Sequence, residues 1–302
     1  MEKVFAKHAG TKRYVPKGAR DLWARCLTQA AAVAVHYNTE TAWVQLAMLP
    51  KCVLRPHARG GRGSRNASEA QTKELCQRWL NGERATLWPE VTEQRRTAKN
   101  AAREAQQVQR CLQLAEDAQY SKSCAALTSE PPATVTPDVV AQMRRKHPPN
   151  PQGVNTASLP PVHAAAALQV DGAAVEREVR AFPRGSAAGP TGLRPQHLKD
   201  ALNNAAHRDE VVEQLRHLVN LFARGQAPAA TAELFASLVA LPKKDGGLRP
   251  VAVGETLRQM PLPRGCRRRA PPTRASPGRR RGPWGHRGCG SHGPPVVAPQ
   301  LR

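Results

Sequence analysis

The chain lacks most of the features that assign a protein to a class from sequence alone. Aromatic residues make up only 4% of its 302 residues, and 27 prolines interrupt it, so we expect a hydrophobic core in places rather than throughout. No run of 18 apolar residues occurs, and charges are spread over the first ten residues. These patterns predict neither a membrane span nor a signal peptide. We therefore expect an intracellular protein without a membrane partner, in the nucleus or the cytoplasm.

Metal-binding spacings are also missing. The seven cysteines are scattered, and no C-x-x-C or H-x-x-x-H pair accompanies them. A structural zinc site is therefore not expected, and no cofactor is expected in this chain. An odd number of scattered cysteines fits a reducing compartment.

What the chain has in excess is positive charge. Lys and Arg number 46 against 23 Asp and Glu, which gives a formal net charge of +23. Each phosphate that Lys or Arg neutralises releases condensed counterions, so this excess favours RNA or DNA as a partner. A basic composition without any binding role is the alternative.

Residues 1–130 are predicted to form a basic helical region. Apolar residues recur at helical spacing over 20–49, where Pro50 is expected to end the helix, then from Ser68, and along a long helix from about Glu90 to Leu127. The loop before Ser68 is rich in Arg and Gly. Its arginines are candidate contacts to a phosphate backbone, because guanidinium groups form forked hydrogen bonds to phosphate; a solvated connecting loop is the alternative. The candidates are Arg59, Arg62 and Arg65.

A Pro-rich linker is predicted over residues 131–170, with one short helix that Thr136 caps and that runs to His147. A second structured region is expected over 171–259.

The second region is predicted to begin with helices. Asp171 is expected to cap a helix that runs through Phe182 and carries Val175 and Val179 toward a core. Two more helices are expected within Pro195–Leu221.

A strand–turn–strand unit follows. Leu238–Leu241 is expected to be a buried strand, Leu248–Val253 the returning strand, and Asp245-Gly246 part of a tight turn between them. Three cations flank this turn. A lysine supplies a point charge and an arginine a forked donor, which suits the oxygens of a triphosphate; a basic hairpin that only faces solvent is the alternative. The cations are Lys243, Lys244 and Arg249.

Two blocks of this region resemble the fingers motifs of reverse transcriptases encoded by non-LTR retrotransposons. Phe182–Lys199 resembles the first motif, and Leu238–Leu257 the second, in which the pattern L-P-K-K-D-G-G-x-R-P-[IV]-A spans Leu241–Ala252. The resemblance implies that the hairpin arginine, together with one of its two lysines, contacts the triphosphate of the incoming deoxynucleotide.

The family's G-P-D-G turn corresponds to Gly189-Pro190-Thr191-Gly192. In the family this turn orders the fingers and lies near the template, and the resemblance implies that role for Gly189, Pro190 and Gly192. Thr191 stands where the family has aspartate, so only a weaker local hydrogen bond is expected there. With companion segments near Trp43, the resemblance covers about residues 15–259.

The carboxylates of a polymerase active site are missing from the printed sequence. Phosphoryl transfer by the family's enzymes needs aspartates that hold two Mg²⁺ ions, a pair of them in a [FY]-x-D-D turn. No such turn occurs, and Asp200, Asp209, Asp245 and Glu255 are interpreted as isolated carboxylates. We expect an inactive fragment of an RNA-directed DNA polymerase.

The fold expected from these patterns is α+β and mainly helical, with incomplete fingers and one β-hairpin. Two other functions stay open. One is a non-catalytic nucleic-acid-binding protein, whose RNA affinity would depend steeply on salt. The other is a helical scaffold that binds proteins through tryptophans, for which the candidates are Trp43, Trp79 and Trp88.

Residues 260–302 differ from the rest of the chain. They hold ten arginines, nine prolines, seven glycines and no acidic residue, which predicts disorder. A basic arm for nucleic acid is one interpretation. A single-base frame slip near Gln259 or Met260 is the favoured one, because codons for residues 275–292, read one base over, can encode Q-V-Q-V-G-V-G-A-P-G-G-T-E-A-V-V-H, which resembles the family's downstream sequence. Sequencing the locus tests this hypothesis.

Overall fold

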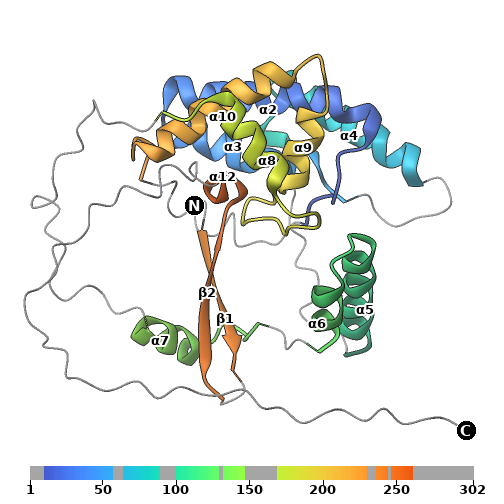
Figure 1. Ribbon diagram of the computed structural model, residues 1–302, viewed down its shortest axis with the longest axis vertical. Helices are drawn as coiled ribbons and strands as arrows, with labels where there is room; N and C mark the ends of the chain where they lie inside the picture. The colour runs from blue at the N-terminus through green and yellow to red at the C-terminus, as the bar shows by residue number, and fades with distance from the viewer. Residues whose placement is uncertain are drawn as a thin grey trace, which may run out of the picture. The chain divides into compact units, whose positions relative to one another are not determined.

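The computed structural model is mainly helical, with a single antiparallel pair of strands among the residues that it describes (Figure 1). Those residues are 10–56, 64–88, 100–128, 132–146, 169–229, 231, 236–243 and 246–260, so the tail predicted to be disordered lies outside them except for Met260. No helix in the described part is long and apolar enough to cross a membrane. The elements are η1 (Lys17–Ala19), α2 (Arg20–Tyr37), α3 (Glu40–Val53), α4 (Ser64–Leu80), η2 (Ala85–Leu87), α5 (Asn100–Glu116), α6 (Tyr120–Thr128), α7 (Pro137–Lys146), α8 (Gly172–Ala181), α9 (Pro195–Leu202), α10 (Arg208–Ala223), β1 (Ala236–Pro242), β2 (Leu248–Gly254) and α12 (Thr256–Gln259).

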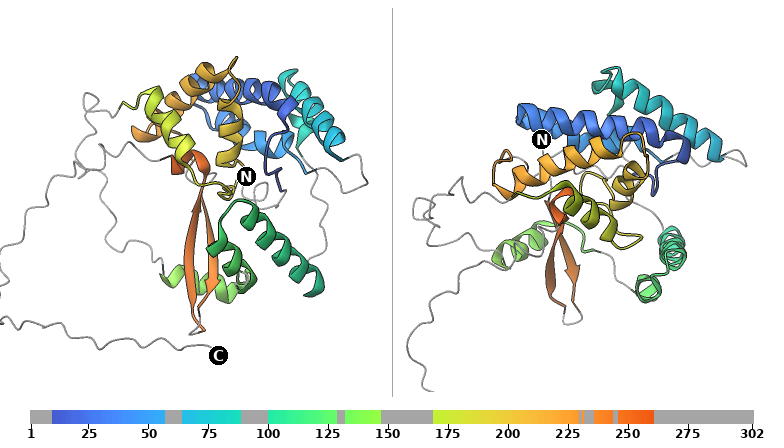
Figure 2. Two further views of the ribbon diagram at one scale, coloured as in Figure 1. Left: turned by 45° about the vertical axis from the view of Figure 1, so that its right-hand side comes forward. Right: turned by 45° about the horizontal axis from the view of Figure 1, so that its top comes forward.

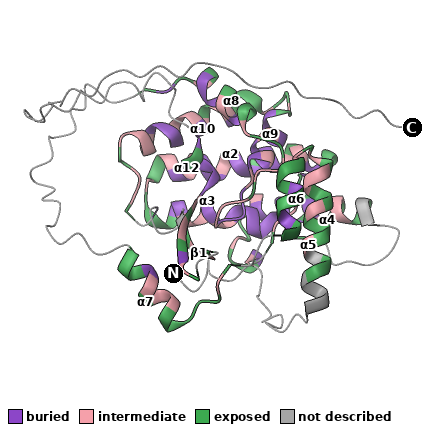
Figure 3. Cartoon of the chain, turned by 60° about the horizontal axis from the view of Figure 1, so that its bottom comes forward, coloured by how far each residue is buried: buried purple, intermediate pink, exposed green. Residues whose placement is uncertain are grey.

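Helix α2 lies within the hydrophobic core and packs against α3, α4, α9 and α10. Trp23, Trp43 and Trp79 are fully buried there, and Figure 3 shows buried residues gathered along α2, α3 and α9. Trp88 packs against the same core. Buried tryptophans do not offer anchors to a protein partner, so Trp43 and Trp79 do not support the scaffold hypothesis, whereas Trp88 is only partly buried.

The segment predicted as one helix ending at Pro50 consists of two helices, and the proline does not end the second. Asn38 adopts a left-handed conformation with φ of 46° and ends α2. Thr39 then begins α3, and its hydroxyl accepts the amide of Ala42 at 3.4 Å. Helix α3 continues past Pro50 to Val53. We attribute this to burial of the last turn, which outweighs the single backbone hydrogen bond that proline removes.

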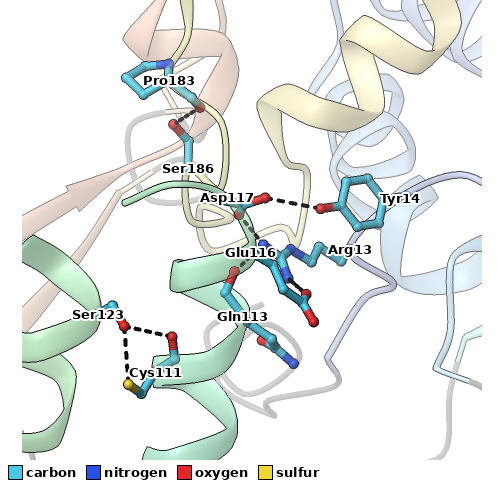
Figure 4. Close-up of polar contacts among 9 residues, drawn as sticks. All are labelled: Arg13, Tyr14, Cys111, Gln113, Glu116, Asp117, Ser123, Pro183 and Ser186. Carbon is cyan, nitrogen blue, oxygen red and sulfur yellow. Dashed lines mark hydrogen bonds and ion pairs between the residues drawn. The ribbon is translucent and has the colours of Figure 1, made fainter. Parts of the chain in front are cut away.

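The long helix predicted up to Leu127 is instead the helical hairpin α5–α6. Ala118 has φ of 58°, and the amide of Gln119 donates to the Leu114 carbonyl at 2.9 Å, which satisfies a carbonyl at the end of α5. The Ser123 hydroxyl donates to the Cys111 carbonyl at 2.9 Å and joins the two helices (Figure 4). The break escaped prediction because no glycine or proline marks it. Residues 89–99, the start of the predicted helix, lie outside the described residues.

Helix α7 begins as the sequence predicts, with the Thr136 hydroxyl accepting the amide of Val139 at 3.3 Å. Although it lies within the predicted linker, α7 packs on the hairpin, where Met143 forms a small apolar cluster with Ala240 and Leu248. Hydrogen bonds hold the ends of this segment to the strands. The amide of Ala133 donates to the Ala240 carbonyl at 2.8 Å, and the Lys146 ammonium donates to the Leu248 carbonyl.

Helices α8, α9 and α10 match the predicted pattern. The Asp171 carboxylate caps α8 by accepting the amide of Ala174 at 2.6 Å, and Val175 and Val179 are buried. Gly225, with φ of 67°, follows the end of α10. These helices complete the core on which the hairpin base rests.

His197 on α9 is fully buried and joins the second region to the N-terminal segment. Its Nδ1 accepts the amide of Arg194 at 3.2 Å, so the proton is on Nε2, which donates to the Lys12 carbonyl at 2.7 Å. The indole of Trp23 donates to the His197 carbonyl at 2.9 Å. Burial lowers the pKa of His197 to about 4. The imidazole is therefore neutral near pH 7.

The predicted hairpin is confirmed. Strands β1 and β2 pair antiparallel in register and run side by side in both views of Figure 2. Beyond the strand ends, the amide of Lys243 donates to the Gly247 carbonyl at 2.8 Å and the amide of Gly246 to the Lys243 carbonyl at 3.1 Å. Gly246 has φ of 75°, as in hairpin loops that contain a left-handed residue. The other predicted turn residue, Asp245, lies outside the described residues.

The burial predicted for the first strand is wrong. Leu238 is 50% exposed, whereas Ala240 is only 8% exposed. A hydrophobic run of this length does not reveal whether one face or two will be covered. Here a single short helix, α7, packs on the strands near Ala240.

Candidate nucleic-acid interface

The strand register assigns each hairpin residue to one of two faces, because side chains alternate along a strand. Helix α7 contacts Ala240 and Leu248, which lie on the same face. The opposite face carries both described members of the predicted triphosphate-binding set. We call it the cationic face, and its residues are Ser237, Val239, Leu241, Lys243, Arg249, Val251 and Val253.

Lys243 and Arg249 are neighbours at the tip of the cationic face. Lys243 is opposite Gly247 and Arg249 is opposite Leu241, so the two cations are diagonal neighbours about 7–8 Å apart. Both side chains are exposed, and neither forms an ion pair with another described residue. Their charges are therefore accessible to an anion. Lys244 lies outside the described residues.

The Gly189–Gly192 turn lies at the base of the hairpin. The amide of Gly192 donates to the Gly189 carbonyl at 3.0 Å, and the Thr11 hydroxyl donates to the Gly192 carbonyl at 2.7 Å. Gly192 has φ of 84°, which favours glycine. Thr191 is buried, and its hydroxyl accepts the amide of Leu193 at 3.2 Å. The local hydrogen bond expected of this threonine is confirmed.

Glu255 joins the turn to the hairpin, a role that the sequence analysis missed. It directly follows β2, and its two carboxylate oxygens accept the amides of Thr191 at 3.0 Å and of Thr256 at 2.9 Å. The interpretation of Glu255 as isolated is wrong. An ideal Cβ on Gly189 would lie 2.5 Å from the Glu255 Oε2, so this contact requires glycine. Burial raises the pKa of Glu255, which the hydrogen bonds from Thr191 partly oppose.

Asp200 is also connected rather than isolated. Its carboxylate accepts the amide of Val15 at 2.9 Å and pairs with Arg20 at 2.7 Å. Burial raises the pKa of Asp200. Both carboxylates are thus occupied in joining segments of the fold.

A cavity of about 300 Å³ opens between the turn and the base of the cationic face. We call it the base cavity. Two cations line it: Lys51, which is only 3% exposed, and Arg194, which is half-buried. Burial lowers the pKa of Lys51, and the nearby Glu255 carboxylate opposes that shift. The remaining lining residues are Gly10, Thr11, Ala188, Gly189, Pro190, Gly192, Ser237, Val239 and Val253.

A second charged cluster, Arg13 with Tyr14 and Asp117, is drawn in Figure 4. Its charges act on Arg194. Asp117 accepts hydrogen bonds from the Arg13 guanidinium and, at 3.2 Å, from the Tyr14 hydroxyl. Arg13 also donates to the Gln113 carbonyl at 2.7 Å, which joins the end of α5 to the N-terminal segment. Asp117 thus compensates the charge of Arg13. Burial, followed by repulsion from Arg13, lowers the pKa of Arg194.

The Arg/Gly loop contributes no described side chain to this interface. Arg59 and Arg62 lie outside the described residues. Arg65 lies in the first turn of α4, which begins at Ser64 and not at Ser68 as predicted. Arg65 and Ala67 in this stretch favour helix, so the helix begins a turn earlier.

The described residues offer binding chemistry for anions. Among them, no group of three or more His, Cys, Asp or Glu side chains is placed to hold a metal ion. Comparisons found no matching family model, curated protein or solved structure. The function is therefore argued from the residues of the interface.

Proposed function

We propose that this chain is the fingers-bearing part of a retroelement reverse transcriptase and that its hairpin binds the triphosphate of a deoxynucleotide. The observation that carries the proposal is the placement of Lys243 and Arg249, exposed and adjacent on one face of the hairpin. The fingers motifs in the sequence support the same assignment. Arg249 supplies a forked donor and Lys243 a point charge to the phosphate oxygens.

The turn and Glu255 hold the hairpin in place for this task. Gly189 and Thr191 contact Glu255 at the end of β2, so the cationic tip extends from a fixed base. In enzymes of this family, palm aspartates would hold the Mg²⁺ ions that supply the chemistry of phosphoryl transfer. We propose that these 302 residues bind the triphosphate but do not transfer it.

Replacing Arg249 with glutamine is expected to weaken deoxythymidine triphosphate binding about tenfold, because one charged hydrogen bond is lost. Isothermal titration calorimetry at low salt measures the affinity of each variant for the triphosphate. Arg145→Gln is the matched control. Arg145 is an exposed arginine on α7, and its replacement removes the same unit of positive charge. An equal loss in both variants, or thymidine binding as tightly as its triphosphate, would refute the triphosphate assignment.

Primer extension distinguishes binding from catalysis. The purified chain with Mg²⁺, a primed RNA template and deoxynucleotides is expected to give no product. Templated incorporation above background would contradict the proposed lack of transfer. RNA binding with a steep salt dependence, without triphosphate binding, would favour a non-catalytic nucleic-acid-binding protein instead.

A further inference from the structure

We infer that a small cavity beside α10 is a site for a phosphate group, from inorganic phosphate or a small phosphomonoester, with Arg224 as its main donor. The inference is independent of the proposed function, because the cavity shares no lining residue with the hairpin or with the base cavity. We call it the α10 pocket. Its lining residues are Val35, Gln169, Arg216, His217, Asn220, Leu221 and Arg224.

The α10 pocket is formed by three segments that the fold brings together. Helix α10 packs against α2, which supplies Val35, and the two helices lie side by side in Figures 1 and 2. The Asn220 carboxamide holds the third segment, because its Oδ1 accepts the amide of Val170 at 2.8 Å and its Nδ2 donates to the Val170 carbonyl at 3.1 Å. Gln169, the residue before Val170, is exposed and lines the pocket. The hydrophobic core therefore positions the lining.

An unsatisfied donor indicates the charge of the ligand. The Nε of Arg224 is buried and has no hydrogen-bond partner among the described residues. A buried donor without a partner is costly, and a phosphate oxygen would satisfy it. Arg224 also forms no ion pair with another residue in the described part of the chain. Its charge is therefore left for a ligand.

The charges around the pocket leave a net attraction for an anion. The Glu213 carboxylate accepts hydrogen bonds from Arg216 at 2.5 and 2.8 Å, and its Oε1 lies 2.9 Å from Nε2 of His217. Arg216 lowers the pKa of Glu213 to about 2, so this carboxylate stays charged and compensates one of the two arginines. None of the lining residues is acidic. The charge of Arg224 is therefore not compensated.

The end of α10 does not oppose an anion through free carbonyls at the pocket. The Asn220 carbonyl accepts the amide of Arg224 at 3.1 Å, and the Leu221 carbonyl accepts the amide of Gln226 at 2.9 Å. The negative end of a helix arises from carbonyls without such partners. The guanidinium of Arg224 therefore dominates the local field.

The volume of the pocket limits the ligand to a small one. It encloses about 200 Å³, below the range typical of pockets for drug-sized molecules. A phosphate group fits this space better than a nucleotide does, and the forked donors of a guanidinium match two of its oxygens. Val35 and Leu221 form an apolar wall, which suits the short carbon chain of a phosphomonoester.

The test measures the affinity of the whole chain for inorganic phosphate and for glycerol 3-phosphate by isothermal titration calorimetry at low salt. Arg224→Gln is expected to weaken this binding about tenfold, because a charged hydrogen bond is lost. Gln169→Glu is expected to have a similar effect by placing a negative charge at an exposed lining position, where the fold is not disturbed. Arg177→Gln is the matched control. Arg177 is an exposed arginine on α8 that does not line the pocket, and its replacement should change the affinity less than about twofold.

Two results would overturn the inference. If neither pocket variant weakens phosphate binding more than Arg177→Gln, or if acetate binds as tightly as phosphate, the α10 pocket is not a phosphate site. Tighter binding of glycerol 3-phosphate assigns the site to a phosphomonoester, and tighter binding of inorganic phosphate assigns it to the free anion. An oligouridylate that binds far more tightly than both, with the same loss in Arg224→Gln, would overturn the small-ligand assignment.

The outcomes also separate this inference from the proposed function. Arg224→Gln is expected to keep the affinity of the hairpin tip for deoxythymidine triphosphate, and Arg249→Gln to keep the affinity of the α10 pocket for phosphate. A failure at one site therefore leaves the test of the other valid.

Discussion

Gly189→Ala is expected to lower the free energy of unfolding by about 3 kcal/mol, the upper range for forcing atoms into a packed site. The new Cβ would lie 2.5 Å from Oε2 and 2.7 Å from Cα of Glu255. The carboxylate could rotate away only by giving up its hydrogen bond to Thr191. The backbone of Glu255 could not move without shifting the end of β2. Urea unfolding measures the change.

Gly254→Ala is the matched control for this prediction. Gly254 is the last residue of β2, and a Cβ there would meet no atom closer than 3.8 Å. Its effect is expected to stay within about 0.5 kcal/mol. If Gly189→Ala is as stable as Gly254→Ala, the turn does not contact Glu255 as described, and the hairpin base is not fixed in this way.

Acidification is expected to cost about 3 kcal/mol of stability between pH 6.5 and 4 through His197 alone. Burial lowers the pKa of His197 from 6.5 to about 4. Between these values the unfolded chain binds a proton that the folded chain does not, so stability falls as the pH falls. The free energy of unfolding, measured in urea at several pH values, tests this.

Two buried carboxylates make the free energy of unfolding rise as the pH falls, which opposes the effect of His197. The pH dependence of stability must therefore be compared between wild type and a His197 variant. Burial raises the pKa of Asp200 and of Glu255, and the folded chain therefore takes up their protons first. The difference between wild type and His197→Gln isolates the imidazole. Identical slopes for wild type and His197→Gln would contradict a neutral, buried His197.

Local signals in the sequence were sufficient for much of the fold. The caps at Thr136 and Asp171 and the turn glycine Gly246 lie where the sequence predicts them. The hairpin follows from two short apolar runs that flank a Gly-rich turn. The position of Lys243 and Arg249 on one face then follows from the alternation of side chains.

The rest of the interface depends on contacts between distant segments. Glu255 looks isolated in the sequence because its partner, Thr191, is 64 residues away. Lys51 and Arg194 meet at the base cavity only through the folding of the whole helical core. The α5–α6 break likewise has no local marker, and its Asp117 is paired with Arg13 from the start of the described chain. Contacts between distant segments leave no periodic pattern in the sequence from which they could be predicted.

The central claim is that the tip of the cationic face binds the phosphates of a nucleotide. Nuclear magnetic resonance of the nitrogen-15-labelled chain, titrated with deoxythymidine triphosphate, tests it most directly. We predict saturable shifts at the Gly246 and Arg249 amides and at the Arg249 guanidinium, with none on addition of thymidine. Shifts confined to other parts of the chain, or no saturation at the hairpin, would contradict the account.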